Sequence, residues 1–258
     1  YQNQQASGTL GGPILRDRLH FFASYEYERE PSTYVYNARG VFSIFNRDLE
    51  FDTTSKKWLG RLDYQVNSST RLNFRFAGYD RLFYAGGGTT AHPINMGERG
   101  RVASQYNGGL TSVIGGTSVN ELKGGATFYE RLDQSAVLNY NGQLGTPYHP
   151  VLRGGTSVFT FSGYSIGTTP LNIVLDTRNV RDDFTSSYEA GGRHDVKAGV
   201  EYLYFFNDFR WCLRCTGTAD LRKAGFSVTS DQLASMFPVG TWNDAATTTR
   251  MCFSRPLY

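Results

Sequence analysis

Apolar and polar residues alternate with a period of two along several long segments of the chain. In the segment 57–66, every second residue belongs to an apolar set: Trp58, Gly60, Leu62, Tyr64 and Val66. The residues between them are mainly polar, and the segment 71–81 repeats the pattern. A period of two is typical of a β-strand whose two faces have different surroundings. The pattern therefore predicts strands with one apolar and one polar face.

These strands occur in four pairs, each joined by a short polar turn. The predicted turns are Arg16–Arg18, Asn67–Thr70, Gly115–Ser118 and Gly191–Arg193. The flanking segments run for about 10 to 14 residues, whereas strands of soluble proteins peak near five or six. Strands that cross a membrane need about nine to eleven residues. Strand length therefore favours a membrane barrel over a soluble β-sandwich.

Long stretches separate the pairs, and we expect them to be loops. They cover about 29–56, 85–100, 134–178 and 210–258 and hold seven of the eight prolines; only Pro13 lies near a strand. Short turns alternating with long loops are typical of outer-membrane barrels, with the turns in the periplasm and the loops outside. We expect a short helical turn at 230–237.

The predicted fold is thus all-β, an antiparallel transmembrane β-barrel segment of about eight strands that forms a single region over 1–258. Its polar face would carry charges of both signs along a watery wall. These are Glu26, Glu28, Arg61, Asp63, Arg75, Arg81, Lys123, Arg131, Lys197 and Glu201.

Composition supports this interpretation. Charged residues make up 19% of the chain, below the roughly 25% of ordinary soluble domains. The chain holds 17 Tyr and 18 Phe, many near strand ends, where aromatic girdles meet the membrane interface. The expected girdle residues are Tyr25, Tyr27, Tyr64, Phe83, Tyr84, Phe128, Tyr129, Tyr204 and Phe206. A mean hydropathy of −0.40 and the lack of any run of about 18 apolar residues exclude a transmembrane helix but not a barrel.

Two stretches resemble the barrel of Oar-like TonB-dependent receptors. The first is the dense run from Gly11 to Glu26, with Gly-Gly-Pro-Ile, a charged turn, two aromatics and Tyr-Glu in order. The second runs from Val180 to Tyr202, with Val196 where the family usually has Leu. The resemblance implies a barrel of about 22 strands, plugged by an N-terminal domain and driven by a TonB-type energy-transducing protein. We expect a partial barrel that lacks the plug and is truncated at both ends.

The resemblance implies uptake of a siderophore, oligosaccharide or peptide across the outer membrane of a Gram-negative bacterium. Its partners would be outer-membrane lipid, the TonB-type protein acting through the plug, and an unknown small-molecule, sugar or peptide ligand. A small closed eight-stranded barrel with a structural or adhesive role is the alternative, and pairing of the first strand with the last would favour it. The net charge of +3, without basic blocks among aromatics, excludes nucleic acid as an expected partner.

Candidate ligand contacts lie in the first long loop: Tyr34, Tyr36, Arg39, Phe42 and Phe45, with Arg47 nearby. Aromatic rings and guanidinium groups can stack on and orient a sugar, peptide or chelate. The competing interpretation, which we prefer, is that these rings pack loop against loop or line the outer membrane interface.

Cysteines and a serine motif are the remaining chemical candidates. Cys212 and Cys215 favour a loop disulfide over a metal site, because zinc needs four ligands and the histidines are scattered; Cys252 could compete for the bridge. The run Gly163–Gly167 fits a nucleophile elbow in spacing, but no helical pattern follows it. We expect no enzyme activity, metal or cofactor.

Overall fold

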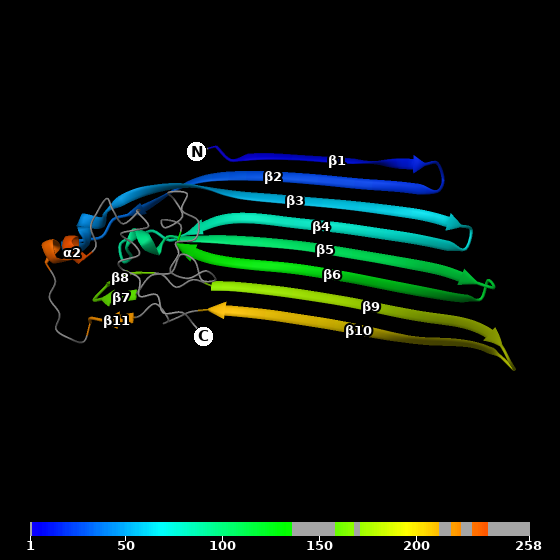
Figure 1. The fold of residues 1–258 in the computed structure, drawn as a ribbon. Helices are drawn as coiled ribbons and strands as arrows, with labels where there is room; N and C mark the ends of the chain where they lie inside the picture. Colours follow the sequence, from blue (N-terminus) through cyan, green and yellow to red (C-terminus); the bar gives the residue numbers. More distant parts are fainter. Residues whose placement is uncertain (1, 136–157, 168–170, 212–217, 223–228, 237–258) are drawn as a thin grey trace.

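Eight long strands form one antiparallel sheet in the computed structural model, which describes residues 2–135, 158–167, 171–211, 218–222 and 229–236 (Figure 1). Neighbours in the chain are neighbours in the sheet. In order, the strands are β1 (Gln4–Leu15), β2 (Leu19–Tyr36), β3 (Arg47–Asn67), β4 (Thr70–Ala85), β5 (Gly97–Ile114), β6 (Ser118–Ser135), β9 (Leu171–Glu189) and β10 (Arg193–Trp211). The predicted all-β fold and the eight long strands are confirmed.

The sheet is open. Within the described residues, β1 pairs only with β2 and β10 pairs only with β9. The first and last strands lie at opposite sides of the sheet (Figure 1). The pairing that would close a barrel of eight strands is therefore not formed in this part of the chain.

Strand register gives the sheet one apolar and one polar face, as predicted. Leu62 on β3 lies opposite Phe21 on β2 and Phe74 on β4, whereas the next residue, Asp63, lies opposite His20 and Asn73. Residues directly opposite each other share a face of the sheet. Each apolar set therefore continues across the strands.

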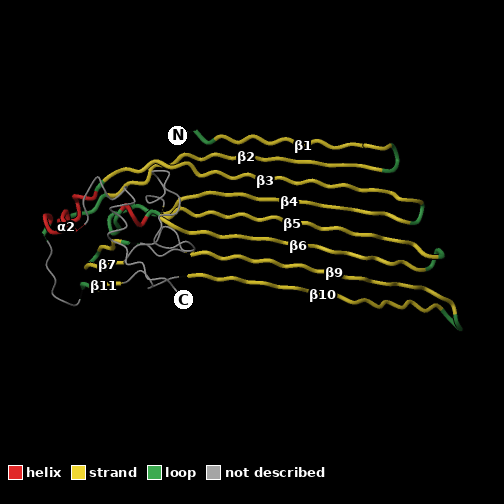
Figure 2. The backbone as a smooth tube through the Cα atoms, viewed as in Figure 1, coloured by secondary structure: helices red, strands yellow, loops and turns green. Residues whose placement is uncertain are grey.

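The turns between paired strands gather at one end of the sheet (Figure 2). Asp17 adopts a positive φ of 62°, which Asp tolerates better than most residues, in the turn between β1 and β2. Gly115 and Gly116 adopt φ of 60° and 77° between β5 and β6, a conformation that suits glycine. The four predicted short turns are confirmed.

A small cap lies at the opposite end and holds the buried apolar core. It comprises η1 (Gly40–Phe45), η2 (Pro93–Asn95), β7 (Val158–Phe161), β8 (Tyr164–Ile166), β11 (Thr218–Asp220) and α2 (Ser230–Met236), with the strand order β11-β7-β8. Phe45, Met96, Ile166 and Leu233 are almost fully buried there. The helix predicted at 230–237 is confirmed as α2, in which the Gln232 backbone amide donates a hydrogen bond to the Thr229 hydroxyl at 3.2 Å.

The loops are shorter than predicted, because the strands extend further. The expected loop 29–56 is mostly strand, since β2 continues to Tyr36 and β3 begins at Arg47. Pro31 lies inside β2, against the expectation that it belongs to a loop. The pairing of β1 ends opposite Arg29, so β2 has only β3 as a neighbour at Pro31. A proline is tolerated on such an edge because no ladder donor is needed there.

Gly78 and Gly60 allow a matched test of side-chain packing on the apolar face. A methyl group added at Gly78 would overlap the Trp58 indole, whereas one added at Gly60 would meet only the Phe76 ring at 4.0 Å. We expect Gly78→Ala to destabilise the intact protein in detergent micelles by about 1–3 kcal/mol. Gly60→Ala should change stability by less than about 0.5 kcal/mol. The measurement is the free energy of unfolding in urea, and equal effects of both substitutions would contradict the stacked position of Trp58.

Candidate functional site

The apolar face carries a band of exposed hydrocarbon across all eight strands. Its inner row, nearest the turns, includes Tyr64 and Leu72, and its outer row includes Tyr25 and Trp58. Tyr64 lies six positions after Trp58, which corresponds to about 20 Å along the strand. Beyond the outer row, the same face becomes charged at Lys56, Asp80, Glu130 and Asp208.

Side chains of this apolar band are open to their surroundings. Phe74 is 45% exposed and Val200 71% exposed. Exposed apolar area of this extent is unfavourable in water. The span of about 20 Å between its rows is close to the apolar band of about 25 Å, flanked by aromatic residues, that faces lipid in outer-membrane barrels. The band is therefore the surface of the sheet that suits lipid.

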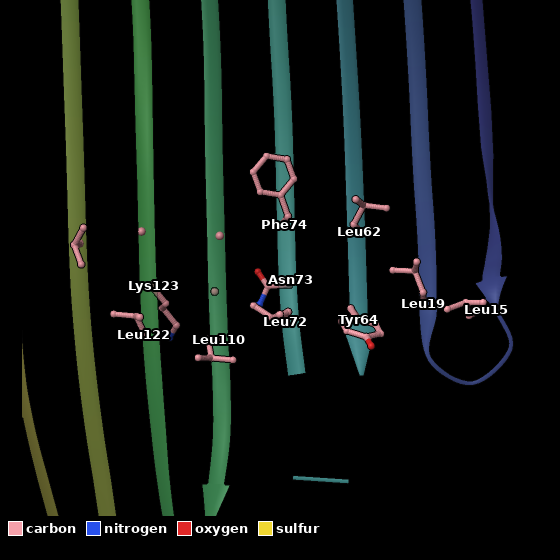
Figure 3. Close-up of a pocket in the computed structure, with 14 residues that line it drawn as sticks. Leu15, Leu19, Leu62, Tyr64, Leu72, Asn73, Phe74, Leu110, Leu122 and Lys123 are labelled. Atoms are coloured by element: carbon pink, nitrogen blue, oxygen red, sulfur yellow. The ribbon is translucent and has the colours of Figure 1, made fainter. Parts of the chain in front are cut away.

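A shallow apolar hollow of about 720 Å³ interrupts the band near the turns (Figure 3). Gly108 on β5 lies opposite Gly124 on β6, so no side chain fills the surface between Phe74 and Val180. Leucine side chains of neighbouring strands form much of its lining: Leu15, Leu19, Leu62, Leu72, Leu110 and Leu122. The lining chemistry suits an acyl chain.

The aromatic girdle is only partly as predicted. Tyr25, Phe128 and Phe206 lie in the outer row with Trp58. Phe83 and Tyr129 lie on the polar face instead, because their register places them opposite Arg99 and Ala103. A position near a strand end does not by itself place a side chain at the membrane interface. Successive residues of a strand point to opposite faces, and these two point to the polar face.

An ion pair on β9 is a polar exception within the apolar band. Arg178 donates two hydrogen bonds to the Asp176 carboxylate, at 3.1 and 2.7 Å. The Arg178 guanidinium carbon lies 5.6 Å from the Phe128 ring centroid and 5.9 Å from that of Tyr204. Pairing and ring contacts reduce the cost of placing both charges among apolar neighbours.

The polar face holds closely spaced charges of opposite sign. Asp63 accepts ion pairs from Arg61 at 2.7 Å and Arg71 at 2.8 Å, and Lys57 contacts Glu26 at 2.7 Å. All ten charged residues that were predicted for the polar face lie on this face in the observed register. Such a face suits water or a polar ligand rather than hydrocarbon.

A pocket of about 550 Å³ lies in the cap, and we call it the cap pocket. Its lining combines an arginine, two aromatic rings, hydroxyl groups and glycine backbone: Arg39, Gly40, Val41, Phe42, Thr89, Thr90, Ser162, Gly163 and Tyr164. The rings of Phe42 and Tyr164 stack with centroids 4.2 Å apart. Burial raises the pKa of the Tyr164 phenol, so this group stays neutral and can donate a hydrogen bond at ordinary pH.

The structure divides the five candidate ligand contacts. Arg39 and Phe42 line the cap pocket. Tyr36 and Phe45 are buried in the core of the cap, and Tyr34 donates a hydrogen bond to the Tyr84 carbonyl at 2.9 Å. These three residues therefore pack within the protein, although Tyr34 and Tyr36 belong to β2 rather than to a loop.

Sequence reasoning missed the contribution of the segment 162–164 to this pocket. Gly163, with a φ of 74°, forms the turn between β7 and β8 and brings Tyr164 to Phe42. The next residue, Ser165, lies in β8, and its hydroxyl accepts a hydrogen bond from the Asn95 amide at 3.2 Å. The serine therefore lies in a short hairpin rather than in a turn between a strand and a helix.

Other predicted chemistry remains untested. Cys212, Cys215 and Cys252 lie outside the described residues. Among the residues that are described, no cluster of three or more His, Cys, Asp or Glu side chains is arranged to hold a metal ion. The same part of the chain contains no helix long and apolar enough to cross a membrane.

Comparison with known proteins gives one match. A family model described as an outer membrane beta barrel domain matches residues 43–250, most of the chain. No curated protein and no solved structure matches.

The ion pair on β9 provides a test of the apolar band. Asp176→Val leaves Arg178 unpaired among apolar side chains, and a lone arginine there costs up to about 2–4 kcal/mol in lipid. We expect the double variant Asp176→Val/Arg178→Val to be more stable than Asp176→Val alone, because it removes both charges. Unfolding of the intact protein in lipid vesicles measures the difference. A double variant less stable than both single variants would indicate an aqueous environment.

His92 makes the stability of the cap depend on pH. Burial against Phe45, together with the nearby Arg47 charge, lowers the pKa of His92 to about 3. The folded cap therefore keeps His92 neutral, whereas the unfolded chain takes up a proton below its ordinary pKa of about 6.5. The stabilisation is complete above about pH 6.5 and is lost as the pH falls toward 3.

We expect the opening free energy of the cap to fall by about 1.4 kcal/mol between about pH 7.5 and 5.5. Hydrogen exchange of the His92 amide, which donates to the Ser165 carbonyl at 2.9 Å, measures this change. His92→Gln is the control, because glutamine does not titrate. The same fall in the variant would assign the effect to other groups.

Proposed function

Because this chain belongs to the family of outer membrane β-barrel domains, we propose that it forms part of the wall and outer loops of a TonB-dependent receptor. It is a protein of the cell outer membrane of a Gram-negative bacterium. The receptor would capture a scarce nutrient outside the cell and admit it through the barrel. The receptor would transport the nutrient and would not catalyse a reaction.

The open sheet is the observation that carries this proposal. Within the part of the chain that the structure describes, the outer edges of β1 and β10 have no partner strand, so their backbone groups are unpaired there. Such groups need partners inside a membrane, because hydrocarbon offers no hydrogen bonds. Further strands of a larger barrel, about 22 in receptors of this type, would satisfy them. A closed eight-stranded barrel with a structural or adhesive role would instead require β1 to pair with β10.

The two ends of the sheet would face different sides of the membrane and have different roles. The short turns would face the periplasm and the cap would face the outside. Arg39, Phe42 and Tyr164 would then offer a charge, a stacking surface and a hydrogen-bond donor to a small molecule, sugar or peptide. A TonB-type protein would supply energy through a plug domain.

We expect loss of the gene and loss of TonB to impair growth on the same scarce nutrient. Growth is measured with iron chelates, oligosaccharides or peptides as the limiting source. Restoring the gene with Arg39→Gln/Phe42→Ala should recover less than about a tenth of the uptake, because two contacts of about 1 kcal/mol each are lost.

Ser43→Ala is the matched control, since Ser43 lies in η1 and does not line the cap pocket. It should restore uptake fully. Growth unaffected by TonB, combined with weakened adhesion or a leaky envelope in the deletion strain, would contradict the proposal and favour the structural role.

A further inference from the structure

Three arginines lie side by side on the polar face, near the cap end of the sheet. Arg81 on β4 is directly opposite Arg101 on β5, which is directly opposite Arg131 on β6. Arg99 lies two residues from Arg101 on the same face. Like charges directly opposite each other destabilise a sheet. We call these four residues the arginine cluster.

Phe83 lies within the cluster and orients its members. The guanidinium carbons of Arg81, Arg101 and Arg99 lie 4.8, 5.2 and 5.9 Å from the centroid of its ring. Cation–π contacts of this kind hold guanidinium groups beside a ring without neutralising their charge. Three positive groups therefore surround one phenyl ring.

Among the described residues, a single carboxylate forms salt bridges with the cluster. Asp133 binds Arg101 and Arg131, each at 2.6 Å, and the Arg101 side chain is only 14% exposed. Neither Arg81 nor Arg99 forms a salt bridge with a residue of the described chain. Four guanidinium groups and one carboxylate leave a local charge of +3.

Other acidic residues of the described strands do not balance this charge. The nearest carboxylate in the same cross-strand row is Glu28 on β2, two strands and roughly 10 Å from Arg81. The segments outside the described residues add five basic residues and one acidic residue: Arg153, Arg214, Lys223, Arg250, Arg255 and Asp244. The cap pocket contributes Arg39 and no acid.

We propose that the arginine cluster binds a small multivalent oxyanion, carrying carboxylate or phosphate groups, on the polar face below the cap. Planar guanidinium groups donate paired hydrogen bonds to either kind of group. The row from Arg81 to Arg131 spans about 10 Å, two strand spacings, which suits a compact ligand better than an extended acidic peptide. The site deepens the proposed receptor function, because it selects anionic nutrients.

Calorimetry tests the site with citrate and pyrophosphate as probes, using the intact protein in neutral detergent at low ionic strength. We expect saturable binding that weakens at least tenfold in Arg81→Gln/Arg99→Gln. The matched control is Arg75→Gln, because Arg75 lies on the same strand and face as Arg81 but outside the cluster. This variant should stay within twofold of the unmodified protein.

A second measurement uses the unmodified sequence and therefore does not depend on the folding of a variant. Phenylglyoxal modifies accessible arginines, and mass spectrometry locates the modified residues. Citrate should protect Arg81 and Arg99 at least fivefold and leave Arg75 unprotected. Equal protection of all three would indicate general charge screening and overturn the assignment.

Two other outcomes would also overturn it. One is the absence of saturable binding of both probes. The other is binding of a hexaglutamate peptide alone, which would assign the cluster to an acidic protein segment. Either result combined with TonB-dependent growth would reject the anion site and leave the receptor function standing. Anion binding without TonB-dependent growth would support the anion site and reject the receptor function.

Discussion

The alternation of side chains across a continuously hydrogen-bonded sheet is the constraint on which the rest of the structure depends. Inside hydrocarbon, each backbone donor and acceptor needs a partner in the protein, and a regular sheet provides it. The same regularity sends successive residues to opposite faces, so that Leu62 and Asp63 meet different surroundings. A slip of one residue in any strand would exchange the faces. Register therefore determines both the apolar band and the polar face.

The sheet and the cap are stabilised in different ways. The apolar band of the sheet is exposed within the chain and needs an apolar medium, whereas the cap buries its own core around Phe45, Met96 and Leu233. Apolar burial is thus concentrated at the end where the long loops lie. A packed cap can hold Arg39 and Phe42 in fixed positions, which flexible loops could not do. The polar face of the sheet extends from this cap toward the turns.

Much of the sheet could be predicted from sequence, because a period of two and short polar turns are local signals. The strand ends could not be predicted in the same way, since β2 reaches Tyr36 only because β3 pairs with it through Pro31. The cap pocket depends on Tyr164 meeting Phe42, more than a hundred residues away. The row of Arg81, Arg101 and Arg131 likewise appears only once the register is known. Composition reveals none of these contacts.

The orientation of the two faces can be measured most directly along β4. Single cysteines would replace each residue from 72 to 77 in a variant whose native cysteines are serine, and each would carry a fluorophore. Quenching by nitroxide lipids should be strong at Leu72, Phe74 and Phe76 and weak at Asn73, Arg75 and Ala77. Iodide in the aqueous phase should give the opposite pattern. Uniform quenching by iodide at all six positions would contradict a sheet with one face in lipid.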